Sequence, residues 1–382
     1  MKNLPKQLQK KIEARKANNA LRQLRAKTDL VDFSSNDYLG FSKHKTIFKN
    51  SHQFLIKHNI IENGSTGSRL LSGNHRTYSI VEDMITNFHG SEAALIYNSG
   101  YDANIGFFSS VPLRGDIILY DEHIHASIRD GMGMNHAKSY KFKHNNLESL
   151  EQLLIRYSEL ISEPTQTVYV VTESVFSMDG DTPNLGKLSK LCTAYKALLI
   201  VDEAHTIGVF GEHGIGLIQE SNIKTFARII TYGKAMGCHG AAILCNDSLK
   251  QYLINFSRSF IYTTALPPHS LATIHASYNE LITSNSQKLL HENIKHFKTE
   301  IKNNTLKSIF IHSNSAIHCC VIPGNDHVKS ISKTLQNSGF NVKPILSPTI
   351  PEGQERLRFC LHAYNTKKEI SEVLSLLATF VA

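Results

Sequence analysis

Short apolar segments recur through the middle of the chain, and longer segments of helical character separate them. The apolar segments are rich in β-branched residues and are bounded by Gly, Asp or Asn, as is typical of buried strands in a mostly parallel sheet. The strands are expected at 93–98 (AALIYN), 116–120 (DIILY), 167–173 (TVYVVTE), 197–202 (ALLIVD), 228–233 (RIITYG) and 241–245 (AAILC). The segment GKLSKLCTAYK, which follows TVYVVTE, predicts the crossover helix of a βαβ unit.

The strand pattern ends near residue 265, at Pro267-Pro268. A long helical stretch (270–303) follows, and then the segments IHCCVIP and RLRFCLH, which together predict a smaller α+β domain. We therefore expect three parts: an N-terminal helix and arm over 1–45, a large α/β domain over 46–267 and a small C-terminal α+β domain over 268–382.

The first 27 residues are strongly basic, with nine Lys or Arg against the single acid Glu13. Leu8, Ile12, Leu21 and Leu24 fall near helical spacing, which predicts a solvated helix with one apolar stripe. A mitochondrial transit peptide is also basic and poor in acids, but this segment has no serine. No apolar run approaches the ~20 residues of a membrane span, so we expect a cytoplasmic protein with no membrane partner.

The six cysteines form no C-x-x-C pair, and the one close pair is Cys319-Cys320. This usage indicates a reducing compartment and argues against a disulfide framework or a structural zinc. We expect no metal site.

The tetrapeptide Asp202-Glu203-Ala204-His205 spells a helicase DEAH box in a chain of net charge +8. A DEAH box works with a G-x-x-x-x-G-K-[ST] phosphate loop, which this chain lacks. After residue 30 there is also no basic stripe interleaved with aromatics, so we expect no nucleic-acid partner. A nucleic-acid-binding protein that uses the basic N-terminal helix is the more distant alternative. Asp202 is instead a carboxylate at the carboxyl end of a strand, where open α/β sheets bind ligands.

The strand ends supply complementary chemistry. AALIYN runs into Ser99-Gly100-Tyr101, where backbone N–H groups at a helix start can bind an anion. The other three ends carry hydroxyls (Ser174–Asp181), a carboxylate with a histidine (Asp202, His205) and a lysine (Lys234). Together they suit pyridoxal 5′-phosphate (PLP), which needs phosphate donors, a lysine for its aldehyde and a carboxylate for its ring nitrogen.

Ordered motifs along nearly the whole chain support this interpretation. They are FSSNDYLGFS (33–42), GSTGSRLLSGNH (64–75), SGYDAN (99–104), HAS (125–127), TESVFSMDGD (172–181), VDEAHTIGVFGEHG (201–214), TYGKAMGCHGA (231–241), IYTTALPP (261–268) and RLRFCLHA (356–363). With these motifs the chain resembles the α-oxoamine synthases, a family of PLP-dependent enzymes of fold type I. The resemblance implies an α/β fold with a mostly parallel central sheet flanked by helices and a smaller C-terminal α+β domain.

The resemblance also implies roles for individual residues. Lys234 would form the Schiff base, Asp202 would pair with the pyridinium nitrogen, and His125 would stack on the ring. The remaining contacts would be His205 and Ser177 to the 3′-oxygen; Gly100, Tyr101 and Thr231 to the phosphate; Thr263 and Thr264 to the phosphate of the neighbouring subunit of a homodimer; and Arg358, Asn36 and Arg22 to substrate. From the residues alone, Arg358 could instead be a surface arginine, Arg22 could be a charge on a solvated helix, and Gly64, Gly67 and Gly73 could be turn residues.

The resemblance favours L-alanine and a pimeloyl thioester, carried by acyl carrier protein or coenzyme A, as substrates. The nearer alternative is another enzyme of the family, such as one that condenses glycine with acetyl-coenzyme A. Glu203 stands where glycine-using members often have Glu, and the segment Ala26-Lys27-Thr28-Asp29-Leu30 is shorter than in relatives, which leaves the position of Arg22 open.

Overall fold

The computed structural model describes residues 4–24, 29–158 and 166–381. The chain forms two compact units: a larger one of Asn36–Ser177 and Asp181–Lys288, and a smaller one of Met1–Ser35, Met178–Gly180 and Leu289–Ala382. These bounds differ from the expected domain boundaries at residues 45 and 267. Helix α11 (Pro268–Thr283) belongs to the larger unit because it packs against α2 (Lys45–Lys57) and α3 (Thr77–His89).

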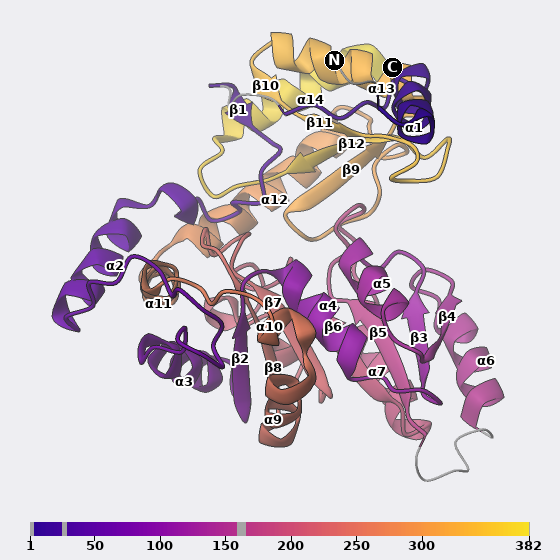
Figure 1. The fold of residues 1–382 in the computed structure, drawn as a ribbon. Coiled ribbons are helices and arrows are strands. Elements are labelled where there is room, and N and C mark those ends of the chain that lie inside the picture. The colour runs from indigo at the N-terminus through magenta and orange to yellow at the C-terminus, as the bar shows by residue number, and fades with distance from the viewer. Residues whose placement is uncertain (1–3, 25–28, 159–165, 382) are drawn as a thin grey trace. The chain divides into compact units, whose positions relative to one another are not determined.

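The larger unit is built on a central sheet in which the described residues supply seven strands, in the order β2-β8-β7-β6-β5-β3-β4 (Figure 1). The strands are β2 (Ala93–Tyr97), β3 (Ile117–Asp121), β4 (Lys138–Phe142), β5 (Val168–Glu173), β6 (Leu198–Asp202), β7 (Ala227–Thr231) and β8 (Ala241–Cys245). Strand β8 runs antiparallel to both β2 and β7, and the other neighbouring pairs are parallel. The predicted mostly parallel sheet is confirmed, with each expected strand within two residues of its observed bounds.

Strand β4 was not expected from the sequence. Of its residues, KSYKF, three are exposed, Tyr140 is partly buried and only Phe142 is buried. Because β4 lies at the edge of the sheet, it needs no continuous apolar run, so the pattern that marks the inner strands is missing here.

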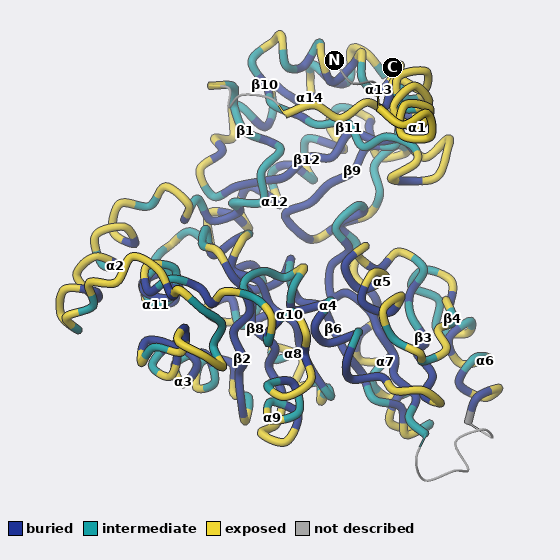
Figure 2. Tube along the Cα trace, viewed as in Figure 1, coloured by how far each residue is buried: buried dark blue, intermediate teal, exposed yellow. Residues whose placement is uncertain are grey.

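Helices cover both faces of this sheet, and the inner strands send alternate side chains to each face. In β5, Tyr169 and Val171 join the core with α4 (Gly100–Ser110), α5 (Ala126–Gly133), α9 (Asp247–Phe256) and α10 (Arg258–Ile261). Val168 and Val170 join the opposite core with α6 (Leu147–Ser158), α7 (Leu185–Ala194) and α8 (Leu217–Glu220). Figure 2 shows the inner strands buried and α2 largely exposed. The predicted crossover helix is α7.

The smaller unit contains an antiparallel sheet of order β11-β12-β9, formed by β11 (Lys343–Ile345), β12 (Arg356–Cys360) and β9 (Ile317–Val321). A short parallel pair joins β1 (Val31–Asp32) to β10 (Phe340–Asn341). Its helices are α1 (Lys6–Ala17), α12 (Ser286–Asn303, which begins in the larger unit), α13 (Asn325–Asn337) and α14 (Lys367–Val381).

Helix α1 is the solvated basic helix expected at the N-terminus, since none of its residues is buried. It ends at Ala17, so Leu21 and Leu24 lie beyond it and are exposed. Ala26, Lys27 and Thr28 of the shortened segment lie outside the described residues. None of the helices that the structure describes is long and apolar enough to cross a membrane.

Candidate active site

The sheet topology brings the predicted site residues of the larger unit to one edge. Strands β5, β6 and β7 are parallel. Strand β2 is antiparallel to β8, which is antiparallel to β7, so β2 runs in the same direction as β7. The carboxyl ends of all four strands therefore meet at one edge, which is where open α/β sheets bind ligands.

Lys234 lies just after β7 and begins a line of hydrogen bonds. Its Nζ is 2.7 Å from His205 Nε2, and His205 Nδ1 is 2.8 Å from the hydroxyl of Tyr38. The Tyr38 hydroxyl donates to Asn36 Oδ1 at 3.1 Å. If Lys234 donates to Nε2, the His205 proton must be on Nδ1, and every bond then runs in one direction. The lysine amine is thus held by a histidine whose own orientation is fixed by a buried tyrosine.

Asp202 ends β6, is only 6% exposed and is held by neutral donors. Asn104 Nδ2 on α4 donates to its Oδ2 at 2.9 Å, and the Ala204 N–H donates to its Oδ1 at 2.9 Å. Asn104 Nδ2 also donates to Ser127 Oγ at 3.0 Å. This arrangement fixes the carboxylate without neutralising its charge.

His125 caps the N-terminus of α5. Its Nδ1 is 2.8 Å from Ser127 Oγ and accepts from the Ser127 N–H at 3.3 Å. Partial burial lowers the pKa of His125, although part of the ring is exposed, and the positive charge of Lys234 lowers it further. A neutral ring with an accepting Nδ1 is consistent with a stacking role.

Glu173 is a second carboxylate beside Asp202. It ends β5, directly opposite Asp202 in the parallel register, and is 3% exposed. Its Oε1 accepts from the backbone N–H of His125 at 2.6 Å. Burial raises the pKa of Glu173 to about 8, and the nearby charge of Asp202 adds to the shift. At neutral pH the group is therefore largely protonated.

The expected phosphate site lies at the start of α4. Ser99 caps this helix by accepting from the Asp102 N–H at 3.0 Å. The N–H groups of the first turn have no partner within a helix, so they can bind an anion. A Cβ built on Gly100 would stand 3.5 Å from Thr231, so glycine keeps open the space between the helix start and that side chain. The Tyr101 hydroxyl points elsewhere, because it donates to Asp130 at 2.7 Å.

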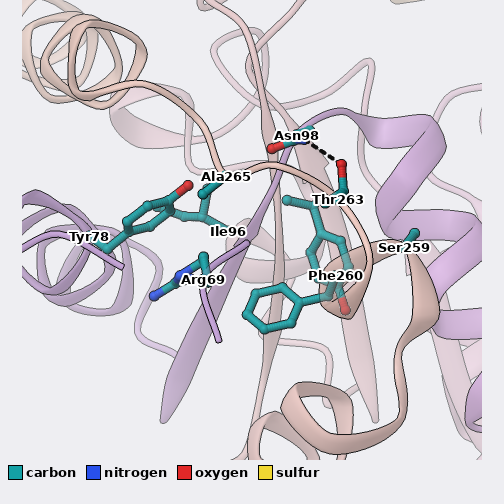
Figure 3. A pocket seen from close by; sticks show the side chains of 9 residues that line it. Arg69, Tyr78, Ile96, Asn98, Ser259, Phe260, Thr263 and Ala265 are labelled. Atoms are coloured by element: carbon teal, nitrogen blue, oxygen red, sulfur yellow. Dashed lines mark hydrogen bonds between the residues drawn. The ribbon is translucent and has the colours of Figure 1, made fainter. Parts of the chain in front are cut away.

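Thr263 and Thr264 lie next to the strand end that leads into this helix. Asn98 Nδ2 donates to Thr263 Oγ1 at 3.0 Å and to the Thr264 carbonyl at 2.7 Å. Figure 3 shows Asn98 and Thr263 beside a small pocket that Arg69 and Tyr78 also line. The predicted threonine contacts with a partner subunit stay a prediction.

The other predicted residues belong to both units. Ser177 lies in the turn after β5, in the larger unit. Arg358 on β12 and Arg22 after α1 belong to the smaller unit. Arg358 is buried and donates to Cys360 Sγ at 2.9 Å, so it is not a surface arginine, whereas Arg22 is exposed. Their contacts with substrate stay predictions.

Sequence reasoning gave no role to Tyr38, Asn104, Ser127 or Glu173, although each stands inside a motif that it singled out (NDYLG, DAN, HAS, TES). Each motif also carries a residue with more obvious chemistry, and nothing in the spacing shows that the second residue supports the first. A polar residue in an otherwise small or apolar motif was the available signal.

Glu203, the departure noted in the sequence, has a structural role. It is fully buried, and its Oε2 accepts from Arg228 Nε at 2.7 Å. Its Oε1 accepts from the Thr206 hydroxyl at 3.0 Å and the Ile218 N–H at 3.1 Å. Because both oxygens are bonded within the fold, Glu203 says little about the choice of amino acid substrate.

Comparison with known proteins shows the family of the chain. The sequence matches the family described as aminotransferase class I and II over residues 28–377. It is similar to an 8-amino-7-oxononanoate synthase from Emericella nidulans, with 38% identity over 92% of this chain and 89% of that one.

Two solved structures are similar as well. One is the 8-amino-7-oxononanoate synthase of Francisella tularensis, with 28% identity and a TM-score of 0.76, covering 92% of this chain and 97% of that one. The other is serine palmitoyltransferase (SPT) with PLP, with 26% identity and a TM-score of 0.84, covering 92% of this chain and 87% of that one.

Proposed function

Because the chain belongs to the aminotransferase class I and II family, we propose that it condenses L-alanine with a pimeloyl thioester to give 8-amino-7-oxononanoate for biotin synthesis. Carbon dioxide and the thiol carrier are released. The predicted fold type and the prediction of a PLP-dependent enzyme are confirmed. The observation that carries the proposal is the set of Lys234, His205 and Asp202 at one sheet edge, in a chain whose curated relatives bear this synthase name.

The residues present fit PLP. The space at Gly100, bounded by Thr231 and the helix start, suits a phosphate. Asp202 offers a buried carboxylate with no cation among its described hydrogen-bond or ion-pair partners, as a protonated ring nitrogen requires. Lys234 offers the amine. When bound, PLP supplies an electron sink that makes the α-hydrogen of an attached amino acid acidic.

The residues of this chain then have separate tasks. The Lys234 amine accepts the α-proton of alanine and later returns a proton to the product, as a general base and acid. His205, fixed by Tyr38, holds that amine in place between these steps. Asp202 holds the ring nitrogen protonated, and His125 covers the ring face. Ser177 binds the 3′-oxygen, and His205 binds it when its Nε2 no longer accepts from Lys234.

Three further residues bind the substrates in the proposal. The guanidinium of Arg358 binds the alanine carboxylate, for which its planar fork is suited. Asn36 and Arg22 position the substrates. Arg358 is only 8% exposed and donates to Cys360 Sγ at 2.9 Å, which supports a role within the fold over that of a solvated surface arginine.

A homodimer completes the site through Thr263 and Thr264 of the neighbouring subunit. Large apolar side chains between residues 48 and 71 support a subunit contact there: Phe48 is 68% exposed, Ile56 78%, Ile61 83% and Leu71 83%. Closed two-fold pairing is the commonest way to cover such a surface.

An anionic carrier, either acyl carrier protein or coenzyme A, delivers the acyl group. Helix α1 supports this part of the proposal, because it carries five basic residues (Lys6, Lys10, Lys11, Arg15 and Lys16) and one acid, and all of it is accessible. The six free cysteines are consistent with a cytoplasmic location, which stays a prediction.

A related acyltransferase is the second candidate, because the SPT structures share this fold and the name of that enzyme refers to other substrates. One competition assay separates the two: alanine and glycine are offered together with pimeloyl, acetyl and succinyl thioesters, and the aminoketone is identified by mass. We expect 8-amino-7-oxononanoate to dominate. If glycine with an acetyl thioester wins by tenfold or more, the substrate assignment is wrong while the cofactor chemistry stands.

A further inference from the structure

His144 lies between two carboxylates just beyond the end of β4. Its Nδ1 is 2.8 Å from Asp121 Oδ1, at the end of β3, and its Nε2 is 2.9 Å from Asp181 Oδ2, in the segment after β5. Asp121 is fully buried, and the His144 side chain is 19% exposed. With a carboxylate on each ring nitrogen, both nitrogens donate, which only the charged imidazolium can do.

Further contacts fix this ring. The Asn145 N–H donates to Asp121 Oδ2 at 2.8 Å, and Asn145 Nδ2 donates to Asp181 Oδ2 at 2.6 Å. The His123 ring stacks on His144 with centroids 4.1 Å apart, and Phe176 meets it edge-on at 4.5 Å. The ring has little freedom to turn away from either aspartate.

Asp181 closes a loop that matters for the proposed site. Its carbonyl accepts from the Phe176 N–H at 3.0 Å, so residues 176 and 181 are drawn together. Ser177 lies inside this loop. The side chain of Asp181 holds one end of the loop to His144, and the ring of Phe176 holds the other end to the same imidazole.

We propose that His144 is a positioning residue, whose imidazolium bridges Asp121 and Asp181 and so holds loop 176–181 where Ser177 meets the cofactor. The bridge ties the loop to the ends of β3 and β4, which are paired in the central sheet. The inference rests on the proposed function, because the role of Ser177 does.

The charge of the bridge is set by its neighbours. Burial opposes protonation, but the hydrogen bonds to Asp121 and Asp181 outweigh it and raise the pKa of His144 to about 9. Glu122 accepts the His144 N–H at 3.1 Å and adds negative charge, while His123 is the nearby group that could add positive charge. Because the folded pKa is raised from 6.5, the bridge is fully formed below about pH 6.5 and is lost as the pH rises through 9.

The test is the rate at which PLP leaves the full-length holoenzyme after dilution, followed by the loss of its visible absorbance. The variants are His144→Gln, Ser177→Ala and the double variant, with His136→Gln as a matched control at an exposed histidine before β4. We expect each of the first two changes to speed release about tenfold, the double variant to be no faster than the faster single, and His136→Gln to match the wild type. Such non-additivity is the signature of residues that act through one element.

The pH dependence gives a second readout that a general loss of stability would not produce. We expect the difference in release rate between the wild type and His144→Gln to shrink toward none above pH 9, where the wild-type bridge is uncharged. Asp181→Asn, which keeps the shape and removes the charge, should behave like His144→Gln, and it serves as the test variant if His144→Gln does not fold.

The outcomes separate the inference from its premise. Three outcomes would overturn the bridge alone. The rate of PLP release could be unchanged in His144→Gln, or the increases in the two single variants could multiply in the double variant. The difference in release rate between the wild type and His144→Gln could also persist above pH 9. Release that is unchanged in Ser177→Ala would show that Ser177 does not hold the cofactor, and the proposed function would then lose this residue together with the inference.

Discussion

Asp202 and Glu203 are adjacent in the sequence and almost equally buried, yet their carboxylates have different partners. Glu203 is paired with Arg228 and has further donors on its other oxygen. Among the described residues, the Asp202 carboxylate accepts only from an amide side chain and a backbone N–H. A buried carboxylate that supports the fold is paired with a cation of the same fold. A buried carboxylate that is hydrogen-bonded only to neutral groups can instead pair with a cationic ligand.

Glu173 extends the comparison to a third carboxylate, because it reaches neutrality by binding a proton. Burial, reinforced by the charge of Asp202, raises its pKa to about 8. Three buried carboxyl groups at the ends of two adjacent strands thus differ in what balances their charge: an arginine for Glu203, a proton for Glu173 and, in the proposed function, the cofactor nitrogen for Asp202.

The largest effect should come from Asp202→Asn. An amide cannot hold the ring nitrogen protonated, so we expect exchange of the alanine α-proton with solvent to slow by on the order of a hundredfold or more. Thermal unfolding should change little, because Asn104 can rotate its amide and present its Oδ1, which has no hydrogen-bond partner among the described residues. Undiminished exchange would show that Asp202 is not the functional carboxylate.

Glu203→Gln is the matched change at the neighbouring position and should have the opposite profile. Leaving Arg228 buried without its carboxylate should lower the free energy of unfolding by about 3 kcal/mol, as measured by denaturant titration. Proton exchange per folded molecule should be nearly unchanged. The double variant Glu203→Met, Arg228→Met should recover much of the stability, and a double variant as unstable as the single would argue against a self-contained ion pair.

Glu173→Gln tests the protonated member through pH. Because the folded pKa is raised from 4.5 to about 8, the folded state keeps a proton that the unfolded chain releases, and the wild type loses stability as the pH rises from 4.5 to 8. The glutamine variant lacks this loss, so its stability relative to the wild type should improve from pH 5 to pH 8. Chemical denaturation at the two pH values measures the change; parallel pH profiles would mean that Glu173 is ionised.

The smallest effect should come from Ser127→Ala, which removes a support one step from Asp202. Asn104 and His125 each lose one neutral hydrogen bond. We expect the free energy of unfolding to fall by about 1 kcal/mol and the rate of α-proton exchange by severalfold. A loss of rate as large as that of Asp202→Asn would mean that the donors, rather than the carboxylate, carry the chemistry.

The sequence by itself predicted the central sheet, because strands buried on both faces must be continuously apolar and such runs are visible in one dimension. It missed β4, since an edge strand need not be apolar. It also predicted Lys234, Asp202 and His205 as site residues, because they stand at or just after strand ends, and His125 from the family motif HAS; these roles stay predictions.

Only the tertiary structure decided what each charge near the site is for. Asp202 and Glu203 look alike in sequence, and their difference depends on Arg228 and Asn104, which are distant in the chain. The same holds for Glu173, whose protonation depends on burial beside Asp202, and for the role that we propose for His144, which depends on Asp121 and Asp181 converging on its ring. Electrostatic roles follow from distance and burial, and these arise only when separate strands are assembled into one sheet.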